Sequence, residues 1–335
     1  MLKHSKLLRE THWLTRLRRA FHYGDRPWQG LIVVISSLVI ILMLTIGAML
    51  WIKSAGSRTT FGWSFLAPAA NPHWDPVNDH FQAWPFLYGT LETSLFAILF
   101  ALPIGIGIAI FLAELCPAWL RTPLTWSVEL LAAIPSVVYG LWGIFVFLPQ
   151  VVAPVGIFLG NTLGKVPVLG SLFTGPIPAS GSSRLAASLI LTIMIIPTIA
   201  AVTRDVFLAI PNSQREAAKA LGATEWETIW QVLIPFGKSG ILGAVILGLG
   251  RALGETMAVT MVIGNSIQGG ASLLHAGYTM ASIIANEFAE SVSQLHTDAL
   301  IEIGLVLFFI TLLLNILARF LVWQVARQAP QEVRA

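Results

Sequence analysis

The chain has 335 residues, of which 56% are hydrophobic and only 11% are charged, and its mean hydropathy is +0.76. That composition excludes an ordinary soluble domain, because a soluble surface of this size carries far more charge. The net charge of +3 does not favour a nucleic-acid-binding protein, since seven of the 20 lysines and arginines precede the first apolar run, as in a positive-inside membrane protein.

The first predicted elements are a basic segment, residues 1–29, and a transmembrane helix, residues 30–52. The basic segment holds seven of the 20 lysines and arginines, and the following 23 residues carry no charge. About 20 apolar residues span a bilayer core, whereas a signal peptide has an apolar region of about 7–15. No small-x-small cleavage site follows the run, so we expect a retained helix with the basic segment in the cytoplasm.

Five further apolar segments follow, and they predict an all-α, polytopic membrane protein with six transmembrane helices. Six crossings place both chain ends, including the tail 324–335, in the cytoplasm. The cytoplasmic segments then hold fifteen lysines and arginines, the outer loops hold four, and Arg251 lies within a span. This bias is the one expected for that orientation. The five segments are 86–113, 125–153, 185–203, 238–265 and 299–323.

Three longer segments are predicted outside the membrane: 53–85, 154–184 and 266–298. The first is rich in tryptophan, proline and polar turn residues, which predicts an ordered surface loop. Its tryptophans are typical of residues at the lipid headgroups, and they also suit a docking surface for an external partner. Both interpretations stay open from the sequence.

A charged stretch with a helical pattern, SQREAAKALGATEWETIWQVLIP, interrupts the apolar segments at residues 213–235. The spacing of Ser213 and Glu216 predicts a capping box, in which the hydroxyl caps a backbone N–H and the carboxylate reaches back. The helix is expected to stop at Gly222, since glycine tolerates the left-handed conformation after a helix end. A helix this short is marginal in water, so the bundle or a partner must hold it.

A second helix is predicted directly after the glycine. Thr224 and Glu227 repeat the capping-box spacing, and Pro235 is expected to end the helix. The cytoplasmic loop 209–236 therefore predicts a helix, a glycine turn and a helix. Its small alanines form a shallow surface against which another protein could pack.

The stretch EAAKALGATEWETIWQVLIP resembles the EAA loop of bacterial ABC-importer permeases, with conservative departures at Val232 and Ile234. The resemblance implies a MetI-like permease core over residues 86–323. In that family the loop sits in a cleft of the cytoplasmic ATPase subunit and couples it to the permease. The coupling role then falls to Glu216, Ala217, Ala218, Gly222, Trp226 and Pro235.

Further runs resemble the permeases of phosphate importers, and the resemblance extends from the first span onward. The run ETMAVTMVIGN, which ends at Asn265, favours the C-type permease over its A-type sister. This implies a bacterial inner-membrane protein that pairs with an A-type permease, a B-type ATPase dimer and an S-type phosphate-binding protein outside, in contact with membrane lipid. The other runs are residues 131–149, 200–211, 248–265 and 287–290.

Arg251 is the candidate substrate residue of the fifth span. It lies 13 residues beyond Lys238, or about 20 Å along a helix, where an arginine costs at least about 2.5–3.5 kcal/mol. Glu255 follows four residues later, on the same face of a continuous helix. The pair either lines an anion path, since guanidinium matches two phosphate oxygens, or bridges helices structurally.

Hydroxyl groups offer weaker candidates for the same path. Ser136 and Thr256, like Thr198, could contact an oxyanion or could make ordinary hydrogen bonds between helices. We expect no catalytic residue, metal or cofactor, because the sequence has no P-loop, nucleophile elbow or metal-ligand cluster. The single cysteine, Cys116, cannot form an internal disulfide.

These patterns predict a transport subunit, with ATP hydrolysis carried out by another chain. The favoured cargo is inorganic phosphate. A permease for another oxyanion or a small solute would share the coupling loop, and a membrane scaffold or sensor in phosphate signalling is the alternative from a different class. An ion channel is disfavoured by the ATPase-docking loop.

Overall fold

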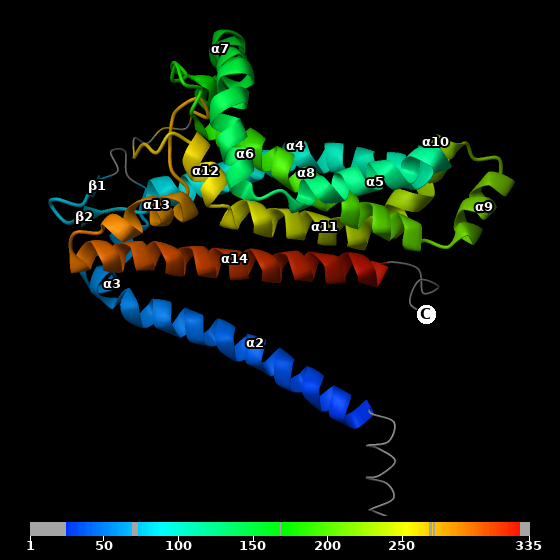
Figure 1. Cartoon of the computed structure of the whole chain (residues 1–335), viewed down its shortest axis with the longest axis horizontal. Helices are drawn as coiled ribbons and strands as arrows, with labels where there is room; N and C mark the ends of the chain where they lie inside the picture. Colours follow the sequence, from blue (N-terminus) through cyan, green and yellow to red (C-terminus); the bar gives the residue numbers. More distant parts are fainter. Residues whose placement is uncertain (1–24, 69–72, 168, 268–269, 271, 329–335) are drawn as a thin grey trace, which may run out of the picture. The chain divides into compact units, whose positions relative to one another are not determined.

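The computed structural model describes residues 25–68, 73–167, 169–267, 270 and 272–328. Almost all regular structure in these residues is helical, which confirms the predicted all-α class (Figure 1). Six of the described helices are long and apolar enough to cross a membrane, as predicted. The chain divides into two compact units, Met1–Lys53 and Ser54–Ala335.

The first unit contains one helix, α2, which runs from Asp25 to Lys53. It includes the whole predicted span 30–52 and begins five residues earlier. The predicted basic segment 1–29 lies mostly outside the described residues, as does the tail 324–335 from residue 329 onward.

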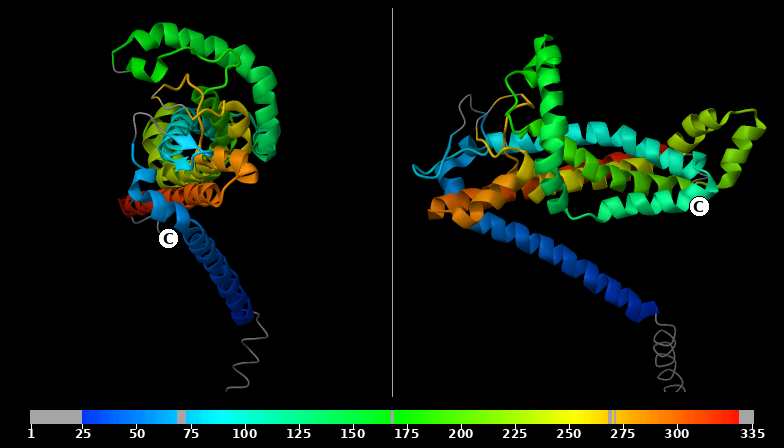
Figure 2. Two further views of the ribbon diagram at one scale, coloured as in Figure 1. Left: turned by 90° about the vertical axis from the view of Figure 1, so that its left-hand side faces the viewer. Right: turned by 45° about the horizontal axis from the view of Figure 1, so that its top comes forward.

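The second unit is a bundle around helix α8, which runs from Arg184 to Ala209 (Figures 1 and 2). Helix α4 packs along α8, and α5 and α11 also lie against it. The core is made of aliphatic side chains such as Ile195 and Ile199. The other long helices are α4 (Trp84–Ile110), α5 (Ala118–Ala133), α11 (Ile234–Gly254) and α14 (Gln294–Gln328).

Two glycines allow the central helices to approach closely. A Cβ atom on Gly105 of α4 would lie 2.8 Å from the Ile199 side chain, and one on Gly248 of α11 would lie 3.2 Å from it. Ile199 therefore fills the space that glycine leaves on both neighbouring helices. Close backbone approach through small residues is a usual way to pack transmembrane helices.

The predicted third span, 125–153, is wrong as a single helix. Helix α5 ends at Ala133, and an extended backbone at Ile134 and Pro135 separates it from α6 (Ser136–Trp142). Proline disfavours a helical conformation at the residue before it and lacks a donor N–H, so the chain breaks there. Helix α6 continues through a π-helix (Gly143–Val152) into α7 (Ala153–Thr162), which runs across the direction of α5 (Figure 2).

The predicted fifth span, 238–265, also has different ends. Helix α10 (Glu225–Thr228) continues through a π-turn (Ile229–Leu233) into α11, so a single helical stretch reaches from Glu225 to Gly254. The expectation that Pro235 ends a helix is therefore wrong. The π-turn directly before Pro235 widens the hydrogen-bond ladder where proline lacks a donor, and so accommodates it. The chain then breaks before α12 (Met257–Val262).

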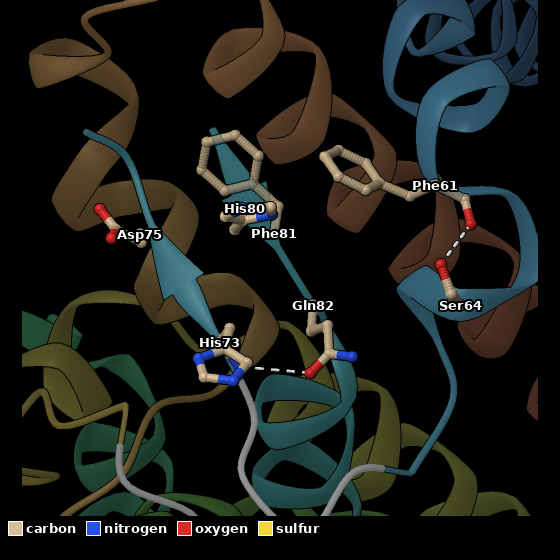
Figure 3. Close-up of a pocket in the computed structure, with 7 residues that line it drawn as sticks. All are labelled: Phe61, Ser64, His73, Asp75, His80, Phe81 and Gln82. Carbon is tan, nitrogen blue, oxygen red and sulfur yellow. Dashed lines mark hydrogen bonds between the residues drawn. The ribbon is translucent and has the colours of Figure 1, made fainter. Parts of the chain in front are cut away.

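The described residues of segment 53–85, which is predicted to lie outside the membrane, are ordered. It folds as α3 (Ala55–Phe61), a 3-10 turn (Gly62–Phe65) and an antiparallel hairpin of β1 (Trp74–Asp75) and β2 (His80–Phe81). Beside the hairpin lies a hollow of about 430 Å³ (Figure 3). It is lined by Phe61, Ser64, His73, Asp75, His80, Phe81 and Gln82.

Trp74 in this loop fits neither of the two interpretations proposed for the tryptophans. Its side chain is buried against Phe81 and Phe86, and its indole N–H donates to Glu287 Oε2 at 2.7 Å. Burial of a large aromatic side chain with a satisfied N–H stabilises the loop. Trp63, in contrast, is 89% exposed.

The described parts of the other two segments predicted to lie outside, 154–184 and 266–298, contain short helices and turns. Helix α13 carries Glu287 at its end and is followed by a 3-10 turn that leads towards α14. The bounds are Leu163–Lys165 and Leu169–Phe173 for the turns after α7, Met280–Glu287 for α13 and Phe288–Glu290 for the turn after it.

Candidate substrate path and coupling surface

Arg251 lies in the last turn of α11 and is half-buried among three helices. Its Nη1 atom donates to the backbone carbonyl of Ala132 on α5 at 3.4 Å and to Thr198 Oγ1 on α8 at 3.3 Å. Both distances are longer than the usual 2.7–3.2 Å of an N–H···O hydrogen bond, so the contacts are weak. The guanidinium therefore retains donors that are not engaged by strong acceptors.

The expected pairing of Arg251 with Glu255 is wrong. Helix α11 ends at Gly254 and Glu255 is extended, so the two residues do not share a face of a continuous helix. Glu255 Oε1 instead accepts from the backbone N–H of Ala258 at 3.2 Å, at the start of α12. Among the ion pairs of the residues described by the structure, none includes Arg251.

Two helix breaks lie beside Arg251. One separates α5 from α6, and Arg251 donates to Ala132 just before it. The other separates α11 from α12, directly after Arg251 itself. Helix α12 packs on α6, where Gly140 leaves room for Met261. Irregular backbone inside a membrane protein is tolerated where it is buried or lines a cavity, so the breaks suit a path.

The two predicted hydroxyl residues lie at these same breaks. Ser136 is the first residue of α6 and is half-buried. Thr256 lies between α11 and α12, and its hydroxyl donates to the carbonyl of Gly254 at 3.2 Å. The structure thus brings all four predicted path residues to helix ends in one part of the bundle.

Arg184 is a buried, ion-paired arginine in the same bundle, and no sequence pattern pointed to its role. Its guanidinium is 3.0 Å from Glu92 Oε2, and both side chains are 4% exposed. It also donates to the carbonyl of Ser272 at 2.7 Å and to that of Gly270, and it lies 5.4 Å above the Tyr88 ring. These partners join α8, α4 and the loop after α12, so Arg184 is structural.

The predicted coupling loop contains the two expected helices, with one error at its start. Helix α9 runs from Asn212 to Ala220, so Ser213 lies inside it and no side chain caps it. Pro211 takes the cap position, where its fixed φ lets the helix begin two residues earlier than predicted. Gly222 has a φ of +91°, which confirms the glycine turn.

The second capping box is confirmed. Thr224 Oγ1 accepts from the backbone N–H of Glu227 at 3.2 Å, and Glu227 Oε2 accepts from that of Thr224 at 2.8 Å. These two bonds satisfy donors that the helix leaves free at its start. The turn between the two helices is therefore held by its own residues.

The loop presents an exposed apolar surface. Leu221 is 90% exposed and Trp226 is 60% exposed, and the ring of Trp226 contacts that of Trp230 edge-on at 5.7 Å. Large exposed apolar groups that lie together mark a site for a partner. A hollow of about 500 Å³ beside them is lined by Gln214, Ala217, Ala218, Leu221, Gly222, Ala223, Glu227, Gln231 and Val232.

The other predicted coupling residues are accessible on the same loop. Glu216 and Ala217 are exposed on α9, and Ala218 is half-buried. Pro235 is exposed on the continuous helix that follows, rather than at a helix end. The surface predicted for a partner is thus open to solvent in this chain.

Sequence reasoning missed the residue that ties α9 to the bundle. Arg215 Nη2 is 2.8 Å from Glu114 Oε1, in the π-turn Phe111–Leu115 that ends α4. Arg215 also donates to the carbonyls of Phe207 at 2.7 Å and Ile210 at 2.6 Å. No local pattern in the sequence relates Glu114 to a residue about a hundred positions later.

Comparison with known proteins identifies the family to which this chain belongs. Residues 105–328 match the family described as binding-protein-dependent transport system inner membrane components. The chain belongs to this family and is a multi-pass protein of the inner membrane.

Relatives named "Phosphate transport system permease protein PstC" match nearly the whole chain. The protein of Pasteurella multocida is 45% identical over 290 residues, which cover 87% of this chain and 89% of that protein. The protein of Haemophilus influenzae is 44% identical over 311 residues, or 92% and 97% of the two chains. The protein of Mesorhizobium japonicum is 43% identical over 307 residues, or 92% of each.

Solved structures share the fold. A bacterial ABC transporter that imports the acidic polysaccharide alginate matches with a TM-score of 0.58 at 15% identity, covering 91% of this chain and 99% of that chain. The alginate transporter in complex with its pentasaccharide-bound periplasmic protein matches with a TM-score of 0.57 at 16% identity, covering 88% and 93%. The expected importer-permease fold is therefore confirmed.

Proposed function

We propose that this chain is the permease subunit of an ATP-driven importer of inorganic phosphate. The observation that carries the proposal is a half-buried arginine, Arg251, that has no carboxylate partner among the described residues and lies beside two helix breaks. The cargo follows from the relatives, which are named as phosphate permeases and are 43–45% identical over about nine tenths of the chain. The translocation path forms between this chain and a homologous A-type permease.

Arg251 supplies affinity for the anion in this proposal. A guanidinium has five N–H donors in a planar fork that matches two phosphate oxygens at once. Its present acceptors are a carbonyl and a hydroxyl at 3.4 and 3.3 Å, which a charged oxygen would outcompete. Ser136 and Thr256 line the same path at the two breaks.

Glu255 has a different role from the one its spacing predicts. It holds the start of α12 through the backbone N–H of Ala258, so it positions the break that follows Arg251. Release of this single bond would allow α12 to shift relative to α11 while Arg251 stays on its helix. Glu255 is thus proposed to set the geometry of the path.

In this proposal, movement of the ATPase subunits is transmitted to the substrate path through the coupling loop. The exposed residues Glu216, Ala217, Gly222 and Trp226, with Ala218 and Pro235, form the proposed contact with a B-type ATPase dimer. An S-type phosphate-binding protein delivers the cargo at the opposite face. Both chain ends and α9 are then cytoplasmic, and ATP is hydrolysed by the partner subunit.

Reconstitution tests the function directly. The chain is purified with its permease and ATPase partners, placed in lipid vesicles with the binding protein, and supplied with radiolabelled phosphate and ATP. We expect uptake that requires ATP, stops with a hydrolysis-deficient ATPase, and persists in excess sulfate. Absence of ATP-dependent phosphate uptake would contradict the proposal, and equal uptake of sulfate would assign a broader cargo.

A further inference from the structure

We propose that Arg215 is a positioning residue for coupling, which transmits the movement of α9 to the membrane helices α4 and α8. The inference rests on the proposed function, in which α9 contacts the ATPase. It assigns a role to a residue that lies next to the predicted contact surface but points back to the bundle.

Helix α9 has little else to hold it. None of its nine residues is buried, so apolar packing does not fix its position. Its other ion pair, between Lys219 and Glu225, joins it only to the start of the next short helix and is largely exposed. Exposed pairs of this kind contribute about 0–1 kcal/mol. Arg215 therefore provides the polar link from α9 to the bundle among the described residues.

The acceptors of Arg215 belong to two different membrane helices. Its Nε donates to both oxygens of Glu114 at 3.2 Å, and its Nη2 is 2.8 Å from Oε1, which makes a forked ion pair with the end of α4. The same guanidinium donates to Phe207 and Ile210 at the end of α8. Carbonyls at a helix end lack partners within the helix, so Arg215 completes the end of α8.

Low exposure of the two side chains makes this link stiff. Both Arg215 and Glu114 have side chains that are 13% exposed, so solvent screens their attraction less than it screens the Lys219 pair. A buried apolar cluster that includes Phe207, Ile229 and Leu233 lies at the same end of the bundle. A displacement of α9 must then either carry the ends of α4 and α8 with it or break several short hydrogen bonds.

The central position of α8 explains why this link matters for transport. Helix α8 packs against α4, α5 and α11, and it carries Thr198, which contacts Arg251. Movement of the end of α8 therefore reaches the helices that meet at the two breaks. Without Arg215, α9 can rotate about Pro211 and the Gly222 turn while the bundle stays still.

The test compares four variants in the reconstituted complex, of which Arg215→Lys is the conservative one, and measures phosphate taken up per ATP hydrolysed. Arg215→Gln removes the link, and Glu114→Gln keeps the shape of the partner while removing its charge. Lys219→Gln is the matched control, because it removes a basic residue of the same helix whose pair is exposed. Copurification of the ATPase and the thermal melting of each complex are recorded alongside.

We expect Arg215→Gln to keep its ATPase partner and hydrolyse ATP, while phosphate uptake per ATP falls about tenfold or more. Glu114→Gln should shift the ratio in the same direction by less, because the bonds to the two carbonyls remain. Arg215→Lys should lower the phosphate taken up per ATP less than Arg215→Gln does, and Lys219→Gln should match the wild type. A role confined to stability would lower the melting temperature without changing the ratio.

Several results would overturn the inference. It fails if Arg215→Gln and Glu114→Gln both couple normally, or if Arg215→Gln loses the ATPase while Glu114→Gln couples normally. If Arg215→Gln does not assemble, Glu114→Gln decides the outcome, and loss of assembly in both also overturns it, since the pair is then needed for folding. Failure of the proposed function appears separately, as a wild-type complex without ATP-dependent phosphate uptake.

Discussion

The regions around Arg251 and Arg215 differ in how strongly the arginine is bound by hydrogen bonds and ion pairs. Arg251 has two weak contacts at 3.3 and 3.4 Å and no ion pair within the described chain, whereas Arg215 has a forked ion pair and two short bonds to carbonyls. The first region is built from broken helices, and the second joins the ends of α4 and α8 to the short helix α9. An arginine that is left without strong acceptors is available to a ligand, whereas one that is saturated can only hold parts together.

The largest expected effect on stability comes from a third arginine, Arg184, and its partner Glu92. Removing this partner tests how much a buried ion pair holds the bundle together. Glu92→Ala should destabilise the bundle by about 3–5 kcal/mol, because it leaves the buried charge of Arg184 unpaired. Thermal melting of the purified complex measures the loss. Glu129→Ala is the matched control, since Glu129 is half-exposed and its partner Arg204 keeps a second ion pair with Asp205, and it should cost less than about 1 kcal/mol. Equal effects would show that burial does not distinguish these arginines.

A smaller effect is expected at the helix breaks. Gly140→Val should cost about 1–3 kcal/mol and reduce phosphate uptake, because the added carbons would push α12 away from α6. A Cβ atom at this position would lie 3.3 Å from Ala258 Cα and would clash with Met261. Gly107→Val is the control, as a Cβ there meets nothing within 4 Å. If both variants transport equally, the packing of α12 on α6 does not shape the path.

The smallest effect is expected in the coupling loop. Thr224→Ala removes a helix cap and should cost about 1 kcal/mol of local stability. Hydrogen exchange of the backbone N–H groups near Glu227 should then become several-fold faster, while the bundle is unchanged. Thr162→Ala serves as the control, because its hydroxyl only bonds a carbonyl of its own helix. Unchanged exchange near Glu227 would mean that the cap does not hold the turn.

Local patterns in the sequence predicted the features that depend on neighbouring residues. Apolar length predicted the six long helices, and the spacing of Thr224 and Glu227 predicted their capping box. The errors also arose from local rules. Pro235 was expected to end a helix, but a π-turn accommodates it, and the helix break at Glu255 separates this residue from Arg251.

The contacts that the sequence could not predict are long-range. Glu114 and Arg215 lie 101 positions apart, and Glu92 and Arg184 are similarly distant. Each pair forms only when separate helices meet, and no periodic pattern marks it. The sequence indicated that Arg251 is unusual, because the free-energy cost of an arginine in an apolar span can be judged from its neighbours in the chain. Its partners could not be predicted, because they depend on where α5 and α8 pack.

The measurement that tests the central claim most directly is ATP-driven phosphate uptake by the Arg251→Ala complex. Arg204→Ala is run beside it, because Arg204 also lies in a membrane helix but is paired with Glu129 and Asp205. We predict that Arg251→Ala assembles and melts like the wild type yet takes up no phosphate above background, while Arg204→Ala transports. Normal uptake by Arg251→Ala would contradict the account.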